Sequence, residues 1–154
     1  MDVIFADQAL EVRPPSIFLA GPTPRAAGVR SWRPEALELL RELGFAGVVL
    51  VPERQDWSAR FSYLDQVEWE YAGLETCSVL AFWVPRDLDT LPGFTTNVEF
   101  GRYVGSGRCV YGRPPDAPHT RYLDWLYNKL TANSPQSTLE ATMRAAIEAT
   151  RRTD

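Results

Sequence analysis

Ser78-Val79-Leu80-Ala81-Phe82-Trp83-Val84 is the most apolar run of the sequence, and Thr95-Thr96-Asn97-Val98-Glu99-Phe100-Gly101 follows it after a loop at residues 85–94. The apolar run predicts a buried strand. Threonine and asparagine are preferred helix N-caps, so we expect a helix to begin within the second stretch. Glu99 then falls in the first turn, where the helix dipole favours the ionised carboxylate. Because strand ends and helix starts border the ligand crevice of an open α/β sheet, Glu99 is a candidate nucleophile.

The same residues support a purely structural alternative. Thr96-Asn97-Val98-Glu99 fits the capping box, in which a glutamate at the third helical position bonds back to the cap residue. On that interpretation Glu99 stabilises the helix and takes no part in chemistry.

Length and composition indicate one globular domain over residues 1–154. The chain has 45% hydrophobic and 23% charged residues and a net charge of −4, which argues against binding to a nucleic-acid backbone and is compatible with a small ligand. Its apolar runs are far below the roughly 18 residues of a membrane span, and no signal peptide is apparent, so we expect a cytoplasmic protein. Cys77 and Cys109 flank apolar runs and are expected to be reduced core residues, and His119 without a Cys/His cluster predicts no metal site.

Apolar runs at residues 16–20, 46–51, 78–84 and 108–111 predict strands, with an edge strand or an arm at residues 2–12. Helical patterns separate them at residues 31–44 and 63–76, around Tyr122–Leu130 and at residues 138–151. This alternation predicts a flavodoxin-like, Rossmann-like three-layer α/β domain with a mostly parallel sheet, in which residues 78–84 are central. The sequence lacks GxxxxGK[ST], GxGxxG and GxSxG, so nothing indicates an NTPase, a dehydrogenase or an α/β-hydrolase.

Glu70 is the second candidate catalytic residue. In the helix predicted at residues 63–76, Leu64, Val67, Tyr71 and Leu74 are expected to form the buried face, and Glu70 shares it. A carboxylate on such a face is costly unless it is paired or lines a cavity, and burial raises its pKa, as a general acid requires. The alternative is a flanking glutamate that reaches solvent past Tyr71.

Four features of residues 16–111, in order along the chain, resemble the nucleoside 2-deoxyribosyltransferase family. The third of them is Glu70, which resembles an acidic residue that lines the family's active site from the helix before the central strand. Leu19-Ala20-Gly21-Pro22 is similar to the turn that shapes the sugar and base site of the family. Pro52-Glu53-Arg54-Gln55 is similar to the loop that carries a base-contacting glutamine. The strand, the acidic loop, the Thr/Asn-rich turn and Glu99-Phe100-Gly101 resemble the family's nucleophile motif.

The resemblance implies cleavage or transfer of an N-glycosidic bond of a (deoxy)ribonucleoside or nucleotide, without metal or organic cofactor. It implies Glu99 as the nucleophile and Glu70 as the acid that protonates or orients the base. The substrate-binding residues that it implies are Phe18, Gly21, Pro22, Gln55 and Asn97. It also implies a homo-oligomer, a dimer or larger. Alternatives are a nucleoside 5′-monophosphate N-glycosidase and a non-catalytic nucleotide-binding or sensor domain.

Two positions depart from the family pattern and favour the non-catalytic alternative. Phe18 stands where the family often has a tyrosine in contact with the nucleophile, and Gly93 stands where an aspartate is expected. Asp87 or Asp89 replaces that aspartate only if the loop folds back, and a turn-forming role is the preferred interpretation of both.

Other side chains leave the alternatives open. Arg25, Arg30 and Arg33 are interpreted either as a phosphate site or as surface charges. Trp32, Trp57 and Trp83 are candidates for stacking on a base, although core packing is the default for Trp83.

Overall fold

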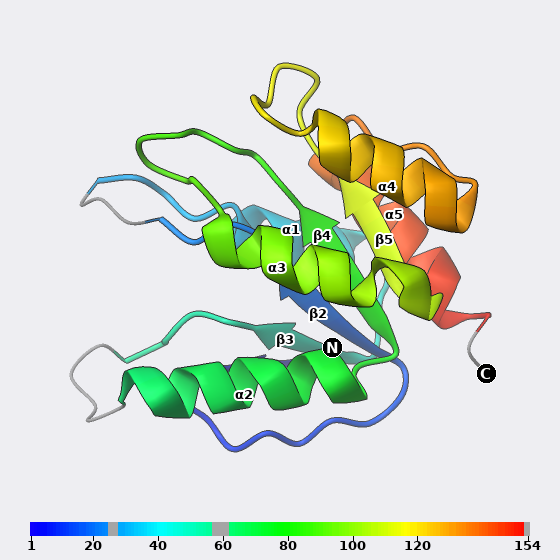
Figure 1. The fold of residues 1–154 in the computed structure, drawn as a ribbon. Helices are drawn as coiled ribbons and strands as arrows, with labels where there is room; N and C mark the ends of the chain where they lie inside the picture. Colours follow the sequence, from blue (N-terminus) through cyan, green and yellow to red (C-terminus); the bar gives the residue numbers. More distant parts are fainter. Residues whose placement is uncertain (25–27, 57–61, 153–154) are drawn as a thin grey trace.

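The computed structural model describes residues 1–24, 28–56 and 62–152. It contains a sheet of five strands in the order β1-β3-β2-β4-β5, in which every neighbouring pair is parallel (Figure 1). The strands are Asp2–Phe5 (β1), Ser16–Ala20 (β2), Val48–Val51 (β3), Val79–Trp83 (β4) and Cys109–Gly112 (β5). The α-helices of the described residues are Arg33–Glu42 (α1), Tyr63–Thr76 (α2), Phe94–Tyr103 (α3), Arg121–Thr131 (α4) and Leu139–Thr150 (α5). The predicted α/β class is confirmed.

The strand positions agree with the sequence analysis except at the centre of the sheet. β4 lies inside the sheet between β2 and β5, as its long apolar run predicts, but the middle strand is β2. The N-terminal segment supplies β1, an edge strand paired with β3, so the strand alternative for residues 2–12 is right for Asp2–Phe5. Four strands are buried along their whole length, which explains their continuous apolar runs.

Two apolar cores separate the three layers. On one face of the sheet, α1 and α5 pack through Leu37, Leu40 and Met143. On the other face, α2, α3 and α4 pack through Leu74, Phe100 and Leu123 (Figure 1). Helices on both faces cover the parallel sheet, as the alternating pattern predicts.

The predicted buried face of α2 is wrong for three of its four residues. Leu64, Val67 and Tyr71 are 64%, 38% and 48% exposed, and only Leu74 is buried. The helix packs instead through Trp69 and Gly73, because the missing side chain of Gly73 brings the helix backbone close to β2. Figure 1 shows the N-terminal half of α2 reaching past the end of the sheet, where no strand lies beneath it.

The strand order reverses between β2 and β4. The chain leaves β2 for α1 on one face, and it leaves β4 for α3 on the other. Such a reversal opens a crevice at the carboxyl ends of the two strands. None of the described helices combines the length and apolar character needed to cross a membrane.

Candidate functional site

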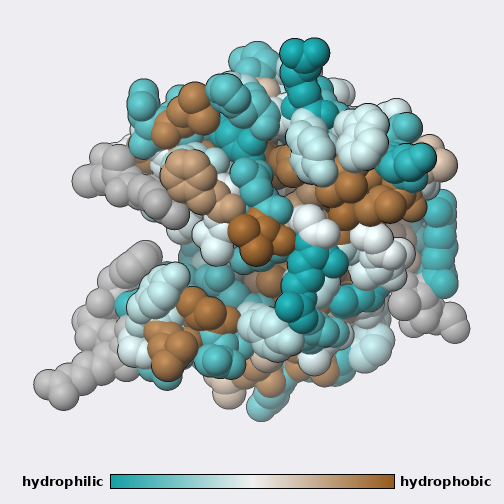
Figure 2. Space-filling view, viewed as in Figure 1, coloured by the Kyte–Doolittle hydropathy of each residue, from teal (hydrophilic) through white to brown (hydrophobic). Residues whose placement is uncertain are grey.

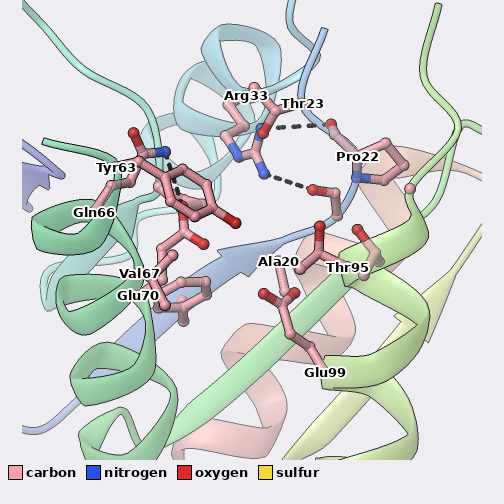
Figure 3. Close-up of a pocket in the computed structure, with 15 residues that line it drawn as sticks. Ala20, Pro22, Thr23, Arg33, Tyr63, Gln66, Val67, Glu70, Thr95 and Glu99 are labelled. Atoms are coloured by element: carbon pink, nitrogen blue, oxygen red, sulfur yellow. Dashed lines mark hydrogen bonds between the residues drawn. The ribbon is translucent and has the colours of Figure 1, made fainter. Parts of the chain in front are cut away.

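A cleft of ≈ 180 Å³ occupies this crevice. Its walls come from β2 and its exit turn, from Arg33 at the start of α1, from α2 and from the first turns of α3 (Figure 3). Among the predicted site residues it brings together Phe18, Gly21, Pro22, Glu70 and Glu99. Residues far apart in the sequence therefore share one cavity at the carboxyl edge of the sheet.

Glycine is required at two points of the cleft wall. A Cβ at Gly21 would lie 2.1 Å from the Trp83 carbonyl oxygen, so only glycine lets the exit turn of β2 press against β4. Gly93 has φ +66°, and a Cβ there would lie 2.9 Å from Cγ of Pro22. The two glycines bring the β2 turn and the start of α3 into contact.

Glu99 lies in the second turn of α3. The helix begins at Phe94 with Gly93 as N-cap and no side-chain cap bond, so the capping box and the first-turn position are both wrong. Asn97, Thr95 and Thr96, the expected cap residues, are already helical. Glu99 is partly buried, and its side chain points into the cleft (Figure 3).

The environment of Glu99 favours its protonated form. Burial, and then the nearby Glu70 carboxylate, raise the pKa of Glu99 to about 7, while the charge of Arg33 opposes the shift. The expectation that the helix dipole keeps Glu99 ionised is therefore wrong. The dipole acts mainly within the first turn of a helix, and Glu99 lies in the second turn of α3.

Glu70 faces the same cavity from α2. Its Oε1 accepts a 2.9 Å hydrogen bond from Nε2 of Gln66, one helical turn earlier. Burial raises the pKa of Glu70, and Gln66 and Arg33 counteract the rise. Figure 3 shows both carboxylates pointing into the space between α2 and α3. Two neighbouring carboxyl groups, of which the charge of Glu70 hinders the ionisation of Glu99, are suited to divide the roles of acid and nucleophile.

Arg33 is a buried part of the cleft wall. Its side chain is 1% exposed, pairs with Glu53 at 2.6 Å and donates to the carbonyl oxygens of Leu19 and Gly21 at 3.1 and 2.8 Å. Nη1 also donates to Oγ1 of Thr23 at 3.1 Å. The surface-charge interpretation of Arg33 is therefore wrong, and protein acceptors engage donors on all three nitrogens of its guanidinium.

A sequence model for a family described as nucleoside 2-deoxyribosyltransferase like matches residues 14–117. The chain belongs to this family. The match includes every strand and helix that builds the cleft, whereas α4 and α5 lie beyond it. Membership supports a glycosyl-transfer type of function in general and a small-molecule nucleoside as ligand. A search of the curated proteins found no match.

The structure gives a physical reason for one departure from the family pattern. Gly93 adopts a left-handed conformation against Pro22, so a side chain at this position would be strained. Phe18 is buried beneath the cleft, with its ring 6.2 Å from that of Trp69. It offers no hydroxyl group to Glu99. Thr95 and Thr96, about one helical turn before Glu99, place hydroxyl-bearing side chains in the cleft wall.

Two residues that the family resemblance implies as substrate ligands lie outside the cleft lining. Gln55 is exposed, and its Oε1 accepts a 3.0 Å hydrogen bond from Nε2 of Gln8. Asn97 faces away along α3, and its Oδ1 accepts a hydrogen bond from Arg86. The sequence does not indicate this placement, because a loop position or a helix face cannot be fixed by counting from a motif.

The remaining candidates have mostly structural roles. Trp83 is buried in the core, and Trp32 is buried and donates to the Pro22 carbonyl oxygen at 3.0 Å. Asp87 accepts hydrogen bonds from Asp89 N and Thr90 N, which confirms its turn-forming role.

Arg30 is exposed, whereas Arg25 and Trp57 lie outside the described residues. Gln66, Tyr63 and the ion pair of Arg33 are parts of the cleft that the sequence analysis missed. Of these, only Gln66 carries a sequence signal, because it precedes Glu70 by four residues.

Proposed function

We propose that the protein transfers the sugar of a deoxyribonucleoside from one nucleobase to another, with Glu99 as nucleophile and Glu70 as general acid. The observation that carries the proposal is the meeting of these two partly buried carboxyl groups in one cleft at the strand-order reversal. Family membership supplies the reaction type.

The proposed reaction has two steps. A carboxylate oxygen of Glu99 bonds to C1′ while the C1′–N bond breaks, and the departing base takes the electron pair and a proton from Glu70. A nitrogen of the second base then attacks C1′, the ester bond to Glu99 breaks, and Glu70 recovers a proton from the incoming base. The reactive state has Glu99 ionised and Glu70 protonated, so the one proton of the pair must move to Glu70 from Glu99, whose pKa burial raises.

The cleft favours an unphosphorylated substrate. Of the described residues that line it, Arg33 is the only cation, and protein acceptors engage its donors. Hydrolysis of a nucleoside 5′-monophosphate is therefore the second candidate, since it needs a phosphate ligand. The missing hydroxyl of Phe18 favours a third candidate, a domain that binds nucleosides without turnover.

Competition between bases tests the proposal. A deoxynucleoside, or its monophosphate, is incubated with the protein with and without an excess of a different free base, and the products are separated by chromatography. Exchanged nucleoside that disappears in Glu99→Gln and persists in Glu68→Gln, an exposed glutamate of α2, supports transfer. Sugar release at a rate indifferent to the added base indicates hydrolysis. A ligand-induced thermal shift without any product indicates a binding domain.

We also propose that the protein forms a homo-oligomer through the outer surfaces of α2 and α3. Leu64, Phe94 and Val98 are 64%, 67% and 71% exposed, and Figure 2 shows hydrophobic side chains over these two helices. The partner that we propose is a second copy of the chain, because family resemblance implies an oligomer and the apolar residues flank the mouth of the cleft.

A further inference from the structure

Arg33 and Glu53 form an ion pair behind the cleft wall. The Nη1–Oε1 distance is 2.6 Å, and the side chains are 1% and 17% exposed. Ser31 Oγ donates to the same Glu53 oxygen at 2.6 Å. Burial lowers the pKa of the Arg33 guanidinium, and Glu53 is the strongest of the groups that oppose this change.

The guanidinium of Arg33 binds successive groups of the β2 exit. Nε and Nη2 donate to the carbonyl oxygens of Leu19 and Gly21, and Nη1 donates to the Thr23 hydroxyl. The ring of Trp32 lies 4.7 Å from Cζ of Arg33. A planar group with five donors can satisfy these acceptors together, whereas a lysine ammonium cannot reproduce the geometry. Arg33 therefore fixes the turn whose other side faces the ligand.

Arg33 is also the cation that acts on both carboxyl groups of the site. Its charge lowers the pKa of Glu70 and that of Glu99, against the effect of burial. Other ionisable groups around the cleft are Tyr63 on α2, Glu53 behind Arg33, and Arg54, which contacts the Gln66 that holds Glu70. Glu53 pairs with Arg33 and is not among the described residues that line the cleft, and its negative charge weakens the field that Arg33 exerts on the cleft.

We propose that Arg33 and Glu53 act as one pair of positioning residues, which fixes the turn at residues 21–23 and sets the positive charge that the cleft wall presents to Glu70 and Glu99. This inference rests on the proposed function. Neither residue touches the reacting atoms. Arg33 acts through the turn and through its charge, and Glu53 acts through Arg33.

The pair makes two opposite predictions for the titration of Glu99. Glu53→Gln keeps an oxygen that accepts from Arg33 and Ser31 but removes the negative charge, so Arg33 acts more strongly and the midpoint falls. Arg33→Met removes the cation, so the midpoint rises. Each shift is expected to reach at least about half a pH unit.

Carbon-13 NMR of protein labelled at the glutamate carboxyl carbons measures these midpoints, and the Glu99 signal is assigned by its loss in Glu99→Gln. Glu38→Gln and Arg41→Met, exposed positions of α1, are the matched controls and leave the midpoint unchanged. Unchanged midpoints in Glu53→Gln and Arg33→Met, or shifts in the same direction, would overturn the proposal. If Arg33→Met does not fold, Glu53→Gln decides alone.

Arg33→Lys separates the geometric role from the charge. It is expected to keep the Glu99 midpoint within about 0.3 units of wild type while raising KM about tenfold, because the displaced turn binds substrate less well. Unchanged KM and kcat would refute the positioning of the turn. The titration needs no substrate, so it is independent of the proposed function. If the midpoints shift as expected but the protein exchanges no bases, the proposed function is refuted and the electrostatic role of the pair stands.

Discussion

Glu99 carries opposite consequences for stability and for turnover. Its pKa is raised from 4.5 to about 7, so the folded state binds the proton more tightly than the unfolded state. Stability is therefore lost as the pH rises from about 4.5 to about 7, when the partly buried carboxylate ionises. The environment that raises the pKa of the proposed nucleophile therefore lowers the free energy of unfolding at neutral pH.

Glu99→Gln should remove that cost and abolish the reaction. We expect turnover to fall by at least about 10³. Between pH 4.5 and pH 8, the free energy of unfolding of the variant relative to wild type should increase by about 1–2 kcal/mol. This is less than the full pKa shift of Glu99 implies, because Glu99 is only partly buried. Urea denaturation at the two pH values measures the second effect. A pH-independent difference would show that Glu99 is not the group that burial protonates.

Glu70→Gln tests the coupling of the two carboxyl groups. Since the charge of Glu70 raises the pKa of Glu99, its removal should move the acidic limb of the kcat/KM profile to lower pH. The rate at the optimum should fall about 10²-fold to 10⁴-fold, because the general acid is lost. Steady-state kinetics from pH 5 to pH 9 measures both effects, with Glu68→Gln as control. A profile that keeps both limb and rate would refute the general-acid role of Glu70.

At the scale of the elements, two helical glycines, Gly73 in α2 and Gly101 in α3, differ in the space available for a side chain. A Cβ at Gly73 would lie 2.8 Å from Cε2 of Phe18, so Gly73→Ala should push α2 away from β2 and destabilise the fold by about 1–3 kcal/mol. Nothing lies within 4 Å of a Cβ at Gly101, so Gly101→Ala should stabilise α3 by about 0.5–1 kcal/mol. Chemical denaturation compares the two, and equal effects would refute the close approach of α2 to the sheet.

The elements also show what the sequence predicts and what it does not. β2 and β4 are predictable because a strand buried on both faces needs an unbroken apolar run. The start of α3 is not, because Gly93 opens the helix in a left-handed conformation that its contact with Pro22 determines, while Thr95, Thr96 and Asn97 are better caps by composition. The exposed stripe of α2 is likewise unpredictable from periodicity, since it depends on where the sheet ends beneath the helix.

At the site, the positions of the two carboxylates are easier to predict from the sequence than the buried arginine that fixes the turn beside them. Glu99 follows a strand and Glu70 lies on an apolar stripe, so both carry a local signal. The burial of Arg33 carries none, because several of its acceptors belong to the end of β2 and its exit turn, and the direction of that turn depends on the clash that Gly21 avoids. Tertiary geometry decides such contacts.

At the scale of the whole molecule, the exposed apolar residues of α2 and α3 predict self-association. Wild-type protein should elute as a dimer or larger, and Leu64→Asp combined with Val98→Asp should shift it to the monomer because two charges oppose burial of the interface. Light scattering after size-exclusion chromatography measures the mass. Leu130→Asp, at a 52% exposed position of α4, is the control that should leave the mass unchanged. A wild-type monomer at about 100 μM would contradict the proposed interface.

The ion pair behind the cleft has a consequence for how this lineage can change. A substitution at Glu53 alone leaves a buried guanidinium without its counter-charge, and a substitution at Arg33 alone leaves three turn acceptors and a carboxylate without their donor. Each single step is costlier than the double replacement, so the two positions are epistatic. Among homologues, arginine at position 33 and an acidic residue at position 53 are expected to be inherited together or exchanged together, and sequences with only one of them should be rare.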